Sequence, residues 1–600
     1  MELTTKTVHD VIHPTAAFST NPPWISGPAV VDRPWAESQL NPKNRIDSLE
    51  LPKKPLWRVD GCTGLGTQYY AVPLFLDNMP PMRIDVFIPE EVAGDGLVRE
   101  LLDLDAAFHT KDGARVARLG IATHIIRTLQ AWTVAGGSGG VESVSEMYET
   151  LPFGSRIIFE NLHLDVRKIR ITIAPTYYVE KQLLAAGNLA AVLGVPADVV
   201  PAAVDISQLS FVEQIHDSVC LVRMSRDGTR PHTHEAGQLW VFKALTSGTK
   251  FLYTELRNLI QLERHPHIIA PPEHIVTKYC RFGGKTAVVG FLLRFHGAGS
   301  LRDHVPLLRI HGRLTLAAQL KWATQLTSAV VHVRERGHIF YPDLRLDNVL
   351  LSDSGDVVMI DFEQRGVWCE FAAPEVNALE YTRILAGGDP LGQEELESAI
   401  QEDVRQRHAD LLSRLLPDWE MLQAGEAFEP LAHGYSTYNV PWQCLSPVEQ
   451  EAAEVYMLGR VLWCIFEGQC APQHAAVWQS YKREPDLEFP NFRETPAELR
   501  ELIDRCTRGR RDVLSQLVTR QGSKLVLRGV PREEQNDADI IRVARDWWAA
   551  EVKVSEEFLL MREEMKARGA WSGNYYDRPK LREVLGFLQN LGSSLASAGT

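Results

Sequence analysis

Two neighbouring segments hold the side chains with the clearest chemical potential in this sequence. The first reads Tyr341-Pro-Asp-Leu-Arg-Leu-Asp-Asn-Val-Leu-Leu351, and the second reads Val357-Val-Met-Ile-Asp-Phe-Glu363. Their polar side chains include Asp343, Asn348 and Asp361. Carboxylate and amide oxygens are hard ligands that suit Mg²⁺, and a carboxylate can accept a proton from a hydroxyl group. The two segments are therefore the first candidates for a catalytic site.

This pattern resembles the catalytic loop and the magnesium-binding segment of protein kinases, which read HRDLxxxxN and DFG in that family. Asp343, Asn348 and Asp361 match residue by residue, in the expected order and spacing. The resemblance implies that Asp343 orients the acceptor hydroxyl and that Asn348 and Asp361 bind one or two Mg²⁺ ions. Arg345 stands where serine/threonine kinases have a lysine that contacts the γ-phosphate of ATP. It keeps the charge of that lysine but not its shape.

A strand predicted over residues 239–245 would place further binding residues opposite these segments. Its alternation puts Val241 and Lys243 on one face, and it resembles the VAIK strand of kinases. The resemblance implies that Lys243 holds the α- and β-phosphates of ATP, that Val241 covers the adenine, and that Leu350 forms the floor of the adenine site. Glu255 occupies the position of the glutamate of helix C. An ion pair between Lys243 and Glu255 is therefore predicted.

Downstream segments extend the resemblance to near residue 592. Ala373-Pro-Glu375 is similar to the APE motif, and Arg578 stands where kinases have the arginine that pairs with its glutamate. A structural ion pair between Glu375 and Arg578 follows. Residues 454–466 resemble the buried helix F of the family. The pattern as a whole is similar to a divergent group of fungal kinase-like proteins.

The resemblance predicts an α+β fold with the two lobes of a protein kinase over residues 205–592, with insertions near 376–450 and 510–573. Residues 56–200 predict a small N-terminal α+β module, because candidate strands such as 83–88 and 169–173 alternate with helical stretches such as 97–104. Residues 1–55 are rich in Pro, Asn and Ser and predict a disordered tail.

Several positions depart from the kinase pattern. No glycine occurs over residues 215–222, where a glycine-rich loop would cover the phosphates, so weak affinity for ATP is expected. Glu363 replaces the DFG glycine, and Tyr341 and Pro342 replace the HRD histidine and arginine. The segment 361–375 is short and has no Ser or Thr between its DFE motif and Ala372. We therefore expect no phosphorylation switch here, and recognition of a peptide substrate stays open.

Composition limits the remaining possibilities. The chain is 45% hydrophobic and 23% charged, as in globular proteins, and its net charge of −14 argues against broad binding to nucleic acid or anionic membranes. No run of eighteen apolar residues occurs, so no membrane span is expected. The eight cysteines form no CxxC pair, which favours the reducing cytoplasm or nucleus.

Three weaker signals each have a simpler interpretation. The glycines of residues 61–66 have the wrong spacing for a phosphate loop and indicate a turn, and the glycines of 136–140 indicate a flexible loop. A metal site at residues 232–234 would lack two further ligands, so a solvated turn is favoured. Cys369 is a candidate redox-sensitive thiol, but a small buried side chain is favoured.

These observations favour an ATP- and Mg²⁺-dependent phosphotransferase, most simply a serine/threonine-type protein kinase that acts on a hydroxyl group. Two alternatives stay open. The missing loop glycines and the replaced DFG glycine are compatible with a pseudokinase that acts as a scaffold or binding module. The short segment 361–375 and the large insertions are compatible with a kinase-fold enzyme that phosphorylates a small molecule.

Overall fold

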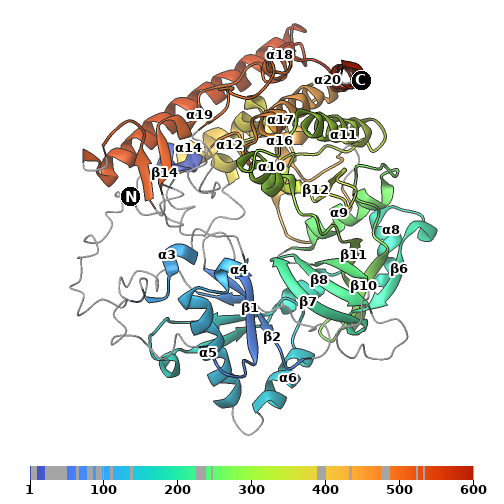
Figure 1. Ribbon diagram of the computed structural model, residues 1–600, viewed down its shortest axis with the longest axis vertical. Helices are drawn as coiled ribbons and strands as arrows, with labels where there is room; N and C mark the ends of the chain where they lie inside the picture. The colour runs from blue at the N-terminus through green and yellow to red at the C-terminus, as the bar shows by residue number, and fades with distance from the viewer. Residues whose placement is uncertain are drawn as a thin grey trace.

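The computed structural model of the 600-residue chain has a mixed α+β architecture (Figure 1). It describes residues 1, 10–19, 51–62, 67–76, 85–88, 98, 101–107, 113–135, 140–224, 238–244, 248–387, 400–431, 435–473, 487–521, 524–531 and 534–598. The predicted loops at 136–139 and 63–66 and the candidate metal site at 232–234 lie outside these residues. Among the described helices, none combines the length and the apolar content needed to cross a lipid bilayer.

An N-terminal module is built around a five-stranded sheet in the order β1-β2-β3-β4-β5. Its strands are β1 (Trp57–Cys62), β2 (Gln68–Pro73), β3 (Asp85–Phe87), β4 (Arg156–Phe159) and β5 (Ile171–Ala174), and its helices are α3 (Leu104–Ala107), α4 (Gly113–Val116), α5 (Gly120–Ala135) and α6 (Gly140–Thr150). Helix α5 buries Ile121, Ile125 and Leu129, whose spacing of four residues places them on one helix face. The module has a hydrophobic core of its own, built from residues of both its strands and its helices.

The boundary between this module and the next unit lies earlier than the predicted position near residue 205. Helices α7 (Tyr177–Gln182) and α8 (Leu189–Leu193) bury Val179, Leu183 and Leu189 in the core of the second unit. The backbone of Leu184 also bonds to that unit, because its N–H donates to the hydroxyl of Tyr253 at 2.8 Å. Composition does not change at residue 177, so the packing of these short helices could not be predicted from the sequence.

A six-stranded sheet follows, in the order β6-β10-β11-β9-β8-β7. Its strands are β6 (Ala202–Asp205), β7 (Leu209–His216), β8 (Val219–Met224), β9 (Leu239–Ala244), β10 (His274–Cys280) and β11 (Lys285–Arg294). Strand β6 is parallel to β10, and the other neighbours are antiparallel. Helix α9 (Thr249–Gln261) connects β9 to β10 and packs its apolar residues, such as Leu252 and Leu256, into the same core.

The N-terminal module is bonded to the edge of this sheet. The Arg58 side chain on β1 donates to the carbonyl of Val212 on β7 at 2.8 Å. The carboxylate of Asp60 accepts the N–H of Gln214 at 2.9 Å. These bonds satisfy backbone groups at the edge of the sheet, and they place β1 beside β7 (Figure 1).

The rest of the chain is mainly helical. Its elements are α10 (Leu301–Ile310), α11 (Leu316–Glu335), β12 (Val349–Leu351), β13 (Val357–Met359), α12 (Pro374–Gly387), α14 (Glu402–Leu415), α15 (Trp419–Gln423), α16 (Val440–Gln443), α17 (Pro447–Glu467), α18 (Ala497–Cys506), β14 (Val518–Gln521), β15 (Lys524–Leu527), α19 (Asp537–Ala567) and α20 (Leu581–Ala598). Helix α17 is the buried centre of this region. Ser446 and Glu449 form a capping box at its start, and Gly468 ends it in a left-handed conformation.

The two predicted insertions pack against each other. Helices α12, α14 and α19 lie together at the end of the molecule opposite α5 and α6 (Figure 1). The helical turn η1 (Pro14–Ala17) joins them, and the indole N–H of Trp548 donates to the carbonyl of Val11 at 2.9 Å. The prediction of a disordered tail is wrong for residues 10–19, because Val11 and Ala16 bury their side chains against α19.

Candidate functional site

The centre of the candidate site is the ammonium group of Lys243. Strand β9 pairs with β8 and β11, which places Lys243 opposite Val219 and Phe291. The Lys243 Nζ atom lies 2.5 Å from a carboxylate oxygen of Glu255, 2.7 Å from Asp361 and 3.1 Å from Glu363. The predicted ion pair between Lys243 and Glu255 is therefore present, and two further carboxylates share the same cation.

Helix α9 fixes one side of this cluster. Glu255 is fully buried on the helix, and its second oxygen accepts the N–H of Phe362 at 3.0 Å. One helical turn further, the Asn258 side chain donates to the carbonyl of Phe362 at 3.1 Å. Helix α9 therefore bonds to both backbone groups of Phe362, and it positions the neighbouring Asp361 beside Lys243.

The backbone at Asp361 is strained. Its φ angle is 68°, in the left-handed region that residues other than glycine rarely adopt, and Gln364 has a φ of 59°. The Gln364 side chain compensates locally by donating to the carbonyl of Phe340 at 2.6 Å. Strain of this kind persists only where surrounding contacts impose it, and it concentrates at functional sites.

Burial and charge act in opposite directions on the ionisable groups of the cluster. Burial alone would lower the pKa of Lys243, but Asp361, Glu255 and Glu363 outweigh it and raise that pKa well above its ordinary value. Burial likewise would raise the pKa of Asp361, yet Lys243 lowers it below its usual range. Burial raises the pKa of Glu255, the most enclosed of the three acids. The ionised form of Asp361 is therefore favoured, as a metal ligand requires.

The catalytic-loop residues form a second cluster. The Asn348 amide donates to the Asp343 carboxylate at 2.8 Å and to the Asp343 carbonyl at 3.0 Å. Both N–H bonds of the amide are used, so only its oxygen remains for a cation. The Arg345 guanidinium lies 2.8 Å from the other Asp343 oxygen. Burial raises the pKa of Asp343 although Arg345 opposes the shift, and this direction favours proton acceptance from a hydroxyl group.

Tyr341, which stands where the kinase motif has its histidine, is buried in the structure. Its buried hydroxyl donates to the carbonyl of Ile360, and its ring packs edge-on against Phe362 with centroids 5.2 Å apart. These contacts join the loop to the segment that bears Asp361. The loop also contacts Trp368, because the Arg345 guanidinium lies over the Trp368 ring, 4.5 Å from its centroid.

Val241 and Leu350 both lie partly exposed at the margin of the common core, Val241 on β9 and Leu350 on β12. Leu350 pairs with Ser300 through an isolated bridge just before α10. Both side chains are apolar surfaces of the kind that a nucleobase could contact. Their assignment to an adenine site stays a prediction.

The loop that would cover the phosphates is a tight hairpin. Strand β7 ends at His216 and β8 begins at Val219, and these two residues are paired, so Asp217 and Ser218 alone form the turn. The Gln214 side chain stabilises the turn by donating to the carbonyl of His216 at 2.5 Å. The absence of glycine therefore corresponds to a short hairpin with little backbone to wrap a triphosphate.

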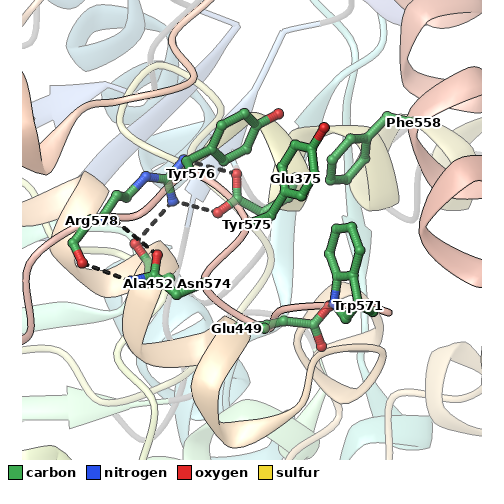
Figure 2. A pocket seen from close by; sticks show the side chains of 10 residues that line it. Glu375, Glu449, Ala452, Phe558, Trp571, Asn574, Tyr575, Tyr576 and Arg578 are labelled. Carbon is green, nitrogen blue, oxygen red and sulfur yellow. Dashed lines mark hydrogen bonds and ion pairs between the residues drawn. The ribbon is translucent and has the colours of Figure 1, made fainter. Parts of the chain in front are cut away.

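The predicted pair of Glu375 and Arg578 is confirmed. The Arg578 guanidinium donates twice to the Glu375 carboxylate, once at 3.0 Å, and it also donates to the carbonyl of Ala452 at 2.9 Å. Figure 2 shows this pair beside a pocket of about 260 Å³, part of it open to solvent, which Phe558 and Trp571 line on the other side. None of the residues that line this pocket belongs to the clusters around Lys243 and Asp343.

Two contacts of the site were missed by sequence reasoning. Glu363 was regarded only as the loss of a glycine, although an acidic residue two positions after Asp361 signals a possible partner for Lys243. The stacking of Trp368 on Arg345 had no sequence signal. Cys369 is half-buried, so the favoured interpretation of a buried side chain holds only in part. Burial, with Glu380 and Glu370, raises the pKa of its thiol above the ordinary value, which disfavours a reactive thiolate.

Comparison with known proteins gives a partial match. No family model matches the chain. A protein of Oryza sativa subsp. japonica, provisionally named CBL-interacting protein kinase 13, is 32% identical over 123 residues, which cover 20% of this chain. The matched part spans 21% of that protein's length. The match supports a protein-kinase-like relationship for part of the chain.

Proposed function

We propose that this chain is an ATP-dependent phosphotransferase with a divergent protein-kinase-like fold of two lobes. The observation that carries the proposal is the convergence on Lys243 of Glu255 from α9 and Asp361 from a segment 118 residues away, at 2.5 and 2.7 Å. Most lysines are exposed to solvent, whereas Lys243 is buried and pairs with carboxylates from two distant segments. The order of strands β7, β8, β9, β11 and β10, with α9 after β9, also supports this fold.

The donor set fits MgATP. Lys243 supplies a cation for the phosphates, and the oxygens of Asp361 and Asn348 are hard ligands for Mg²⁺. Val241 and Leu350 supply apolar contacts for the adenine. When bound, MgATP supplies the phosphoryl group, whose γ-phosphorus bonds to the acceptor oxygen while its bond to the β–γ bridging oxygen breaks and ADP leaves.

The protein residues orient the acceptor and move its proton. The Asp343 carboxylate accepts a hydrogen bond from the acceptor hydroxyl and then takes the proton that this hydroxyl loses. Asn348 holds the carboxylate in place through the 2.8 Å bond. Arg345 binds the opposite oxygen and provides positive charge next to the transferred group. The simplest acceptor is a serine or threonine hydroxyl, and a small-molecule alcohol is the alternative that the short segment 361–375 favours.

A second candidate function, a pseudokinase that binds partners without catalysis, is favoured by the two-residue turn between β7 and β8. This turn offers few backbone N–H groups to a triphosphate. In that case the cluster around Lys243 would act only as a structural ion network.

Nucleotide binding distinguishes the two functions. A ligand that binds only the folded state stabilises it by RT ln(1 + [L]/Kd), about 2.7 kcal/mol at one hundred times Kd. MgATP should therefore raise the melting temperature more than ATP with a chelator does, and Asp361→Asn should shrink that difference. The titration should extend to about 1 mM nucleotide, the upper range of typical Michaelis constants. A melting temperature that stays constant over this range favours the pseudokinase.

A further inference from the structure

Glu363, which follows Asp361 and Phe362, has no role in the proposed reaction. The Glu363 side chain is 18% exposed, and its carboxylate lies 3.1 Å from Lys243 Nζ. The Lys243 ammonium donates a hydrogen bond to Asp361 at 2.7 Å and forms ion pairs with Glu255 and Glu363. Glu363 therefore completes the set of partners of Lys243.

The opposite oxygen of Glu363 has its own partner. The Arg365 guanidinium lies 3.4 Å from that oxygen and 4.9 Å from the centroid of the Phe251 ring on α9. The Glu363 carboxylate is therefore held between two cations, one on β9 and one packed against α9. This arrangement restricts its side chain in a way that a solvated surface glutamate would not show.

The charge of the cluster determines what it can bind. Three carboxylates face Lys243, and with every group ionised these carboxylates, Lys243 and Arg365 carry a net charge of −1. A free triphosphate would enter a site that repels it. A divalent cation bound by Asp361 would reverse the sign of this charge, and Glu255 and Glu363 would still hold the amine if Asp361 moved toward the metal.

We propose that Glu363 is a positioning residue that keeps Lys243 in place when Asp361 binds a metal ion and that makes nucleotide binding depend on a divalent cation. This inference rests on the proposed function. This role belongs to position 363, where the kinase DFG motif has a neutral glycine and this chain has an acid. A glycine there would leave Lys243 with Glu255 as its sole carboxylate once Asp361 had turned to the metal.

The test measures the dissociation constant of ATP by equilibrium dialysis, once with excess magnesium chloride and once with EDTA. For each protein, the informative quantity is the ratio of the EDTA value to the magnesium value. In Glu363→Gln this ratio should fall by at least about tenfold, mostly because ATP without metal binds more tightly. A tenfold change corresponds to about 1.4 kcal/mol, which is less than the interaction of two unit charges about 4 Å apart near a protein surface.

Two variants control the result. Glu363→Asp keeps the charge and should keep the ratio near that of the unaltered chain. Glu420→Gln removes an exposed carboxylate on α15 and should change nothing. Melting temperatures check that all the variants are folded.

The outcomes separate the two levels of the proposal. If the unaltered chain binds MgATP but the ratio is the same in Glu363→Gln, the role of Glu363 is refuted while the proposed function stands. A ratio that falls equally in Glu363→Asp also overturns the role, because the effect would then follow shape and not charge. If the unaltered chain binds no nucleotide in either condition, both proposals fail.

Discussion

Neutralising Glu375 should destabilise the folded chain strongly, because it leaves a buried cation without its counter-ion. The Arg578 side chain is fully buried and that of Glu375 is 10% exposed. In Glu375→Gln, the guanidinium would still bond to the carbonyls of Ala452 and Arg508, at 2.9 and 3.0 Å, and would stay between the rings of Tyr456 and Tyr576. These contacts hold it away from solvent, so the expected cost is about 3–5 kcal/mol.

Urea unfolding followed by tryptophan fluorescence measures this cost. The double variant Glu375→Gln/Arg578→Met removes both charges and should be more stable than the sum of the two single variants predicts, by about 0.5–3 kcal/mol. Arg582→Met serves as the matched control, since it removes an arginine from an exposed ion pair with Glu335 and should leave the midpoint unchanged. A loss below about 1 kcal/mol in Glu375→Gln would show that the pair is not the buried ionic contact described here.

Three further predictions follow from the site and its supports. Burial would raise the pKa of Glu449, but Arg562 outweighs burial and lowers that pKa from 4.5 to about 2. The ionised Glu449 should therefore stabilise the fold fully above pH 4.5, and this stabilisation should be lost as the pH falls toward 2. Unfolding free energies measured across this pH range should show the loss, and Glu449→Gln should abolish this pH dependence. Asp343→Asn should reduce phosphoryl transfer by at least about 10²-fold without lowering the melting temperature, as measured with γ-labelled ATP. Phosphatase treatment should leave the transfer rate unchanged, because residues 362–372 contain no hydroxyl side chain, and a large loss that mass spectrometry maps to this region would contradict the reasoning.

The resemblance to kinase motifs was sufficient to predict two of the contacts between opposite charges. The pairs of Lys243 with Glu255 and of Glu375 with Arg578 join segments far apart in the chain, and both are present. Such pairs could be predicted because a buried charge requires a partner, and the motifs restricted which partner was near. The mixed α+β architecture was predicted in part on a different ground, because the hydrophobic periodicities of strands and helices differ.

Packing decided what the sequence could not show. Helices α7 and α8 belong to the second unit because Val179 and Leu189 are buried in its core and the N–H of Val288 on β11 donates to the carbonyl of Leu184, and local composition does not predict this packing. The composition of residues 10–19 predicts no structure, yet this segment packs against α19, where the indole N–H of Trp548 donates to the carbonyl of Val11. The left-handed backbone at Asp361, two residues before Glu363, could not be predicted from the residue type there.

Magnesium-dependent release of ADP from ATP tests the central claim most directly. Purified chain should release ADP when magnesium chloride is present and should stop when EDTA is added. Lys243→Met and Asp361→Asn should each lose this activity, because each removes one of the two charged groups that lie 2.7 Å apart in the site. Each variant should keep its folded far-ultraviolet circular dichroism spectrum. No release by the unaltered chain at about 1 mM ATP, or release that persists undiminished in both variants, would contradict the account.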